Sequence, residues 1–215
     1  LLSLMGIKII DAVPNFQDLS FKFHFPLKKG YISLLGVGGI SKSVYKPPKD
    51  SSLWANDGDR LGDISGSQSA IGAFTWFYPL GKNSYLKTIV SSSYFSPEYT
   101  EDSTGNDYQI YQLSRKSSEQ QNNIASILFH SKINVRHIIR SGIIFRNQNF
   151  ADNTFSYTYN GGEHKHILND NKGSLNLVQA YFQYKYTINE NFSVTPGFHT
   201  LYLLNNGRLS FEPRV

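Results

Sequence analysis

Apolar and polar side chains alternate along several stretches of the chain. Within residues 19–25 every odd position is apolar and every even position is polar, and residues 178–187 and 192–199 follow the same period of two. Successive side chains of an extended strand point to opposite faces of a sheet, so each stretch has one apolar and one polar face. No stretch shows the 3.6-residue period of an amphipathic helix. The pattern predicts an all-β protein.

Short polar turns divide these stretches at regular intervals of 53 to 55 residues; they are centred on Lys29, Lys82, Val135 and Glu190. Between consecutive turns we expect a strand, a long polar loop and a second strand. The expected loops are centred on residues 46–64, 96–118 and 150–172. The result is an antiparallel up-and-down meander of about nine strands. These span residues 17–27, 31–45, 66–80, 85–99, 119–133, 137–155, 174–188, 192–204 and 208–215.

Short turns at one end of the strands and long loops at the other are typical of outer-membrane β-barrels, which present an apolar face to lipid and a polar face to the lumen. Several expected strands exceed the roughly 9–11 residues that cross a membrane. Aromatic residues flank the tight turns. We interpret them as an interfacial girdle, although hairpin ends of soluble sheets also carry aromatics. They are Tyr31, Phe77, Tyr78, Tyr85 and Phe192.

The expected strand count is odd, whereas bacterial barrels have an even number of strands. We therefore expect a sheet that does not close by itself. Residues 1–215 are interpreted as a single segment of a larger barrel, an internal piece of a longer chain without its plug and signal peptide.

Composition removes several classes of function. The chain contains no cysteine, which excludes disulfides, thiolate metal sites and cysteine nucleophiles. Its longest nearly apolar run, residues 32–40, is far shorter than the roughly 20 residues of a membrane-spanning helix. The net charge of +5 is scattered along the chain without a basic run or a nucleic-acid-binding motif, so we expect no nucleic-acid partner.

Four segments resemble a known family. They are VPNFQDLSFKFHFPLKKGYISLLGVGGIS (13–41), LGKNSYLKTIVSSS (80–93), LVQAYFQYKYTINENFSVTPGFHTLYLLNN (177–206) and FEPRV (211–215). These segments resemble TonB-dependent outer-membrane receptors, in particular the branch whose chains begin with a carboxypeptidase-regulatory-like domain and a plug. The resemblance implies a barrel of about 22 strands with a plugged lumen in the outer membrane of a Gram-negative cell. This chain would supply about two-fifths of that barrel.

The resemblance also implies a function. The whole protein would bind a scarce nutrient at its extracellular loops and import it by TonB-coupled gating, without enzymatic chemistry. Its partners would be outer-membrane lipid, the plug domain of the same parent chain, and the energy-coupling complex, reached through an N-terminal part that these residues lack. Two alternatives remain open: a soluble β-rich ligand- or carbohydrate-binding module, and a passive porin-like channel.

Candidate site residues follow from this interpretation. Exposed loops carry recognition, and the ligand-contact candidates in the long polar segments are Trp54, Arg60, His164 and His166. Basic residues on the expected lumen side could line an anion path or, as we favour, pack against the plug; they are Lys22, Arg140, Arg146 and Lys185.

No metal site or cofactor is expected. The two histidines lack a third ligand nearby in sequence, and residues 56–59 (NDGD) are interpreted as a turn because the bidentate glutamate of a calcium loop is missing. The glycines of residues 36–39 (GVGG) lie within a strand pattern and do not form a dinucleotide loop. They are expected to let the barrel bend or to leave room for a plug.

Overall fold

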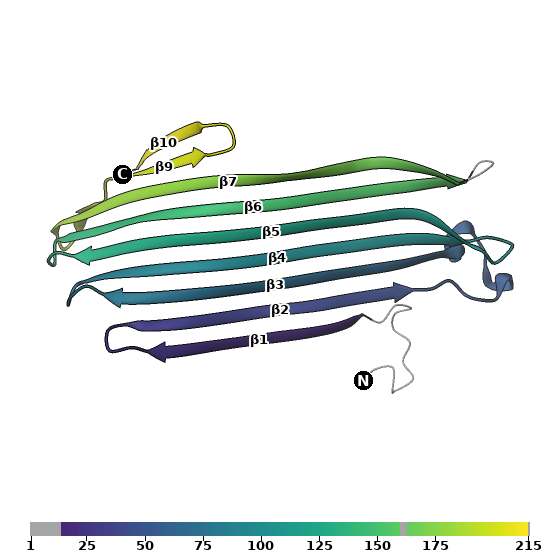
Figure 1. The fold of residues 1–215 in the computed structure, drawn as a ribbon, viewed down its shortest axis with the longest axis horizontal. Coiled ribbons are helices and arrows are strands. Elements are labelled where there is room, and N and C mark those ends of the chain that lie inside the picture. The colour runs from purple at the N-terminus through teal and green to yellow at the C-terminus, as the bar shows by residue number, and fades with distance from the viewer. Residues whose placement is uncertain (1–13, 160–162, 215) are drawn as a thin grey trace.

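The computed structural model describes residues 14–159 and 163–214, which form one antiparallel sheet. The strands lie side by side in chain order (Figure 1), with β8 pairing to β7 beside this path. They are β1 (Asn15–Pro26), β2 (Tyr31–Tyr45), β3 (Leu61–Pro79), β4 (Ser84–Thr104), β5 (Ile110–Lys132), β6 (His137–Tyr159), β7 (Glu163–Asn189), β8 (Phe192–Val194), β9 (Gly197–Leu203) and β10 (Arg208–Arg214). The predicted all-β, up-and-down, open meander is confirmed. One expected strand, 192–204, is divided into β8 and β9 around Pro196.

Two of the three predicted long loops are wrong. The polar segments 96–118 and 150–172 are mostly paired strand, because β4 and β5 continue to a short turn at residues 105–109, and β6 and β7 reach Tyr159 and Glu163. The polar composition of these segments is typical of loops. A strand that has water on both faces is also polar, because neither face requires apolar side chains at alternate positions. The first segment is a loop as expected, with short 3-10 helices at Ser51–Leu53 and Asp57–Arg60.

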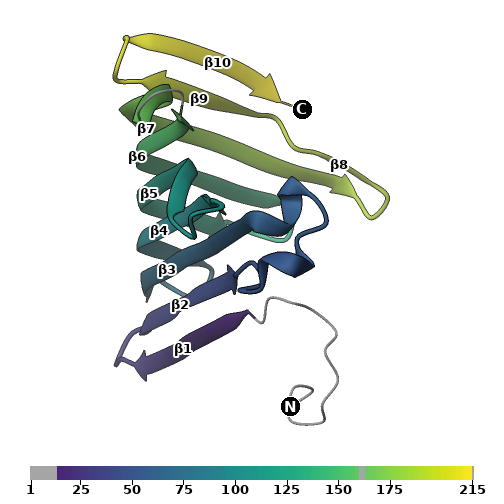
Figure 2. The ribbon, with the colours of Figure 1, turned by 90° about the vertical axis from the view of Figure 1, so that its right-hand side faces the viewer.

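The sheet is a single layer without an enclosed core (Figure 2). Its accessible surface is 15153 Å², whereas a compact monomer of this mass exposes about 10,000 Å². Among the described residues, Leu177 is the only buried hydrophobic side chain. The described part of the chain contains no helix that is long and apolar enough to span a membrane.

Strand pairing assigns each residue to one of two faces, because directly paired residues share a face and successive residues alternate. One face, the apolar face, carries Leu19, Phe21, Phe23, Phe25, Ile32, Leu34, Ile40, Ala70, Phe74, Trp76, Val90, Ile127, Ile143, Phe145, Val178, Phe182, Tyr184, Tyr186 and Phe198. Many of these side chains are open to solvent; Ile143 is 60% exposed. The other face, the mixed face, carries basic and polar side chains beside residues such as Ile144.

The tight-turn ends of the strands are offset along the sheet. The row of paired residues that starts at Tyr31 in β2 reaches Tyr181 in β7, and β7 continues for eight more residues to Asn189. At about 3.3 Å per residue the offset is about 26 Å, across five strand spacings that total about 24 Å. The line through the strand ends therefore makes an angle of about 45° with the rows, close to the strand tilt of about 35–45° in closed barrels.

Candidate functional site

The four basic residues predicted for the lumen side all lie on the mixed face. Lys22 in β1 and Arg146 in β6 belong to one row of paired residues, with four strands between them. Arg140 is paired with His130 and Gln183. Lys185 follows two residues after Gln183 on the same face. None of the four forms an ion pair within the described residues, and Arg146 Nε is buried without a hydrogen-bond partner there.

The pairing adds two basic residues that sequence reasoning missed. Lys87 and Lys132 also lie on the mixed face, so the tight-turn half of this face carries Lys87, Lys132, Arg140 and Lys185. We call these four residues the basic patch. Continuing the period of two from Tyr85 and from His130 would have identified both lysines.

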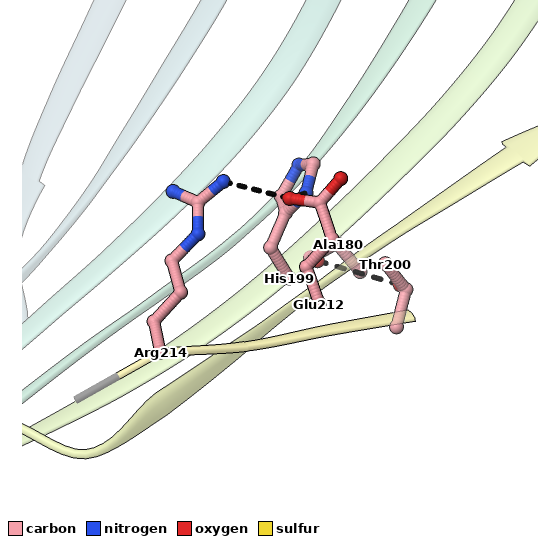
Figure 3. A network of polar contacts seen from close by, with 5 residues as sticks. All are labelled: Ala180, His199, Thr200, Glu212 and Arg214. Carbon is pink, nitrogen blue, oxygen red and sulfur yellow. Dashed lines mark hydrogen bonds and ion pairs between the residues drawn. The ribbon is translucent and has the colours of Figure 1, made fainter. Parts of the chain in front are cut away.

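An acidic residue lies at the margin of this half of the mixed face. Glu212 accepts a hydrogen bond from Arg214 at 2.9 Å, and the same carboxylate oxygen lies 3.3 Å from His199 Nδ1 (Figure 3). His199 and Glu212 are directly paired between β9 and β10. This carboxylate therefore contacts its own neighbours, and no residue of the basic patch forms an ion pair within residues 14–159 and 163–214.

A line of neighbouring rings, alternately tilted and stacked, crosses five strands of the mixed face near the tight turns. The ring centroids of His24 and Tyr31 are 4.6 Å apart, those of Tyr31 and Phe77 5.1 Å, those of Phe77 and Tyr85 5.0 Å, and those of Tyr85 and His130 4.9 Å. The girdle interpretation is wrong for Tyr31, Phe77 and Tyr85, because they lie opposite the apolar face. Tyr78 does lie on the apolar face, with its ring 5.8 Å from that of Trp76.

Trp54 and Arg60 are brought together in the loop between β2 and β3. The Arg60 guanidinium lies 5.2 Å from the centroid of the Trp54 ring, and the indole Nε1 donates to the carbonyl oxygen of Pro48 at 2.9 Å. Tyr108, from the turn between β4 and β5, adds its ring at 5.9 Å and donates to Ser51 Oγ at 2.9 Å. Tyr108 has a positive φ of 60°, a backbone conformation that residues other than glycine adopt infrequently. We call Trp54, Arg60 and Tyr108 the loop cluster.

Neighbouring polar side chains of these loops stabilise their own turns. Asn56 Oδ1 accepts from the Gly58 N–H at 2.8 Å, and Asp59 Oδ2 accepts from the N–H groups of Ala55 and Asn56. The predicted turn at residues 56–59 is therefore confirmed. In the other turn, hydrogen bonds from the Tyr111 hydroxyl and the Gln109 N–H lower the pKa of Asp107 below its ordinary value of 3.8.

His164 and His166 lie in β7 and not in a loop. They are paired with Thr158 and Ser156 on the mixed face, as expected for two residues on one face of an extended segment. Thr158 Oγ1 is 3.0 Å from His166 Nε2. Strands β4, β5 and β6 lie between β7, which carries the histidines, and β3, which follows the loop of Trp54 and Arg60, so the two groups of ligand-contact candidates stand apart. Among the described residues, no three metal-binding side chains gather.

The glycines of residues 36–39 lie inside β2, as predicted. Gly36 is on the apolar face, and a Cβ there would overlap the ring of Phe21 from β1. The Phe21 ring fills the space beside Gly36 on this face. Gly39 lies on the mixed face beside the Asp18 carboxylate.

Comparison with known proteins gives no assignment: no protein-family model matches the sequence, and no curated protein matches it.

Proposed function

We propose that this chain forms part of the wall of an outer-membrane β-barrel that works as an active transporter. The observation that carries the proposal is the apolar face of a single-layer sheet. On each strand the apolar side chains of this face occupy a limited stretch, and together these stretches form an apolar band that runs obliquely across the strands. A lipid bilayer would cover this band, and the mixed face would line the lumen.

The geometry of the band supports a membrane in two ways. On β2 it spans Ile32 to Ile40 and on β7 it spans Val178 to Tyr186, in both cases eight residue steps or about 26 Å along the strand. The row from Ile32 reaches β7 at Ala180, six residues before Tyr186. A shift of about 20 Å over about 24 Å of sheet gives a tilt of about 40°.

The band therefore leans by nearly the same angle as the line of strand ends. A bilayer perpendicular to the axis of a barrel produces this relation, because tilted strands enter the membrane at successive residue positions. Corrected for tilt, the band is about 20 Å high, close to the roughly 25 Å apolar band of membrane barrels.

Active, TonB-dependent import is the part of the proposal that rests on the resemblance of the four segments. In this view the basic patch and Arg146 meet acidic groups of a plug domain in the lumen, and the paired strand ends and the loop cluster meet the nutrient outside the cell. Isoleucines and stacked rings on the mixed face favour a lumen filled by protein over an open aqueous pore, because apolar side chains gain by burial. Bond-making chemistry has no place in this mechanism.

The proposal is tested with the complete protein in its own membrane. We expect it in the outer-membrane fraction, with a gel mobility that changes on heating. Under limitation for iron, cobalamin or a single glycan, deletion of the protein and inactivation of the energy-coupling complex should cause the same growth defect. A defect insensitive to energy coupling would favour a passive channel, and a monodisperse protein in water without detergent would favour a soluble binding module.

A further inference from the structure

A continuous line of hydrogen-bonded polar side chains crosses the apolar face. Ser92 Oγ donates to Asn123 Oδ1 at 2.7 Å, Asn123 Nδ2 donates to Asn147 Oδ1 at 3.2 Å, and Asn147 Nδ2 donates to Asn176 Oδ1 at 2.8 Å. These four residues form one row across β4, β5, β6 and β7. We call them the amide row.

On these strands the amide row adjoins the apolar band, on the side away from the tight turns. The adjacent row on the tight-turn side is Val90, Ala125, Phe145 and Val178, and the adjacent row on the other side includes Gln121, Asn149 and Ser174. The side chains thus change from wholly apolar to wholly polar within one residue pair, about 7 Å along the strand.

On β3, β2 and β1 the same rows carry apolar side chains or glycine on this face. The row of Gln121 and Asn149 continues through Tyr94 to Ala70 on β3 and Gly38 on β2, and Leu19 on β1 completes it. Here the first polar side chain appears one pair farther along, at Gln68 of β3. The boundary between apolar and polar side chains therefore follows the amide row from β7 to β4 and lies two pairs farther from the tight turns on β3, in the direction that the offset of the strand ends requires.

We propose that the amide row marks the outer edge of the hydrocarbon layer on β4 to β7 and contacts the polar headgroups of the outer leaflet, and that this edge turns obliquely away from the row beyond β4 to pass between Ala70 and Gln68 on β3. The proposal rests on the membrane-barrel function above and adds the position of the membrane. The internal hydrogen bonds let the asparagines stand at this edge, because amides without partners are costly in hydrocarbon. Each amide keeps a further N–H for phosphate, ester or sugar oxygens of the headgroups.

This placement also defines how far the sheet extends into the medium. From Asn147 to Tyr159, β6 continues for 12 residue steps, or about 40 Å along the strand. At a tilt of about 45°, the paired strands would rise roughly 28 Å above the membrane. His164 and His166 belong to this projecting wall.

The absence of cysteine from these 215 residues allows a direct test by single cysteine substitutions in the complete protein. The variants are Phe145→Cys and Asn149→Cys on β6, and Ala70→Cys and Gln68→Cys on β3. Intact cells are treated with a membrane-impermeant maleimide, and unfolding in urea measures total thiol. Heat-modifiable gel mobility identifies folded variants, and Ile143→Cys replaces Phe145→Cys if that variant does not fold.

We expect labelling of Asn149→Cys and Gln68→Cys, and loss of labelling for Phe145→Cys and Ala70→Cys until the protein is unfolded. The decisive comparison is Ala70 against Asn149, which share one row and one face. If both label or both are protected while Phe145→Cys stays protected, the membrane barrel stands and the oblique edge is overturned. If Phe145→Cys and Ile143→Cys label freely in the folded protein, the membrane function itself fails.

Discussion

Phe182 and Gln183 are neighbours in β7 and face opposite sides of the sheet, so the pair tests which side meets lipid. Phe182 lies midway between Val178 and Tyr186, the two ends of the apolar band on this strand. Its ring is 5.9 Å from that of Phe198. Gln183 lies on the mixed face and is paired with Arg140.

The substitution Phe182→Lys puts a charge at the centre of the band. A lysine near the bilayer midplane costs about 2–4 kcal/mol in a membrane barrel, and loss of the stacked pair with Phe198 adds about 0.5–1.5 kcal/mol. The matched control, Gln183→Lys, places a charge opposite Arg140 on the lumen side. Like charges on directly paired residues cost about 0.2–1 kcal/mol, so this variant should assemble nearly as well as the unchanged protein.

The assay is the folded fraction of the complete protein in outer membranes, scored by heat-modifiable gel mobility at increasing urea concentration. Phe182→Lys should unfold at clearly lower urea than Gln183→Lys. Equal behaviour of the two variants would refute the assignment of the apolar face to lipid. A soluble sandwich would also suffer from Phe182→Lys, so cysteine variants at both positions complete the test. The thiol at 182 should resist an impermeant reagent in membranes, whereas the thiol at 183 should react wherever the lumen holds water.

Three further predictions concern packing, the loop cluster and pH. Gly36→Ala should destabilise the protein by about 1–3 kcal/mol in urea unfolding, since its methyl group would overlap an aromatic ring; Gly72→Ala, with nothing within 4 Å of its new methyl group, should cost far less, and equal shifts would contradict this packing. Trp54→Ala should speed proteolytic cleavage within residues 46–60, whereas Leu53→Ala, at a side chain 63% exposed, should not; unchanged cleavage of both would show that the indole does not hold the loop. Because hydrogen bonds lower the pKa of Asp107, its stabilisation of the turn is present above the ordinary value of 3.8 and is lost as pH falls through the lower folded value. Amide exchange at residues 105–109 should show this dependence, and Asp107→Asn should abolish it.

The sequence predicts the strands well wherever one side chain in two must avoid water. Residues 19–25 and 178–187 show this period, and both lie in strands of the structure. The halves of β4 to β7 away from the tight turns escape prediction because most of their side chains are polar on both faces. Their sequences are typical of loops, although pairing such as that of Ser117 with Asn153 extends the sheet through them.

The candidate site is predictable only in part, because it depends on register between strands. Sequence alternation correctly assigns Lys22, Arg140, Arg146 and Lys185 to one face. It cannot show which residues of different strands are opposite one another. For this reason the line of rings from His24 to His130 and the amide row have no signal in any single strand.

The apolar face and the mixed face of this sheet need different surroundings, and this difference separates the candidate functions. A sandwich would cover the apolar face with a second sheet and leave the mixed face to water. The mixed face, however, carries stacked rings at Tyr31, Phe77 and Tyr85, and an Arg146 nitrogen without a partner. Both features favour contact with further protein, because aromatic rings gain by burial and a buried guanidinium nitrogen needs an acceptor. A membrane barrel with a filled lumen gives each face the cover it needs, since lipid meets the apolar side and protein meets the mixed side.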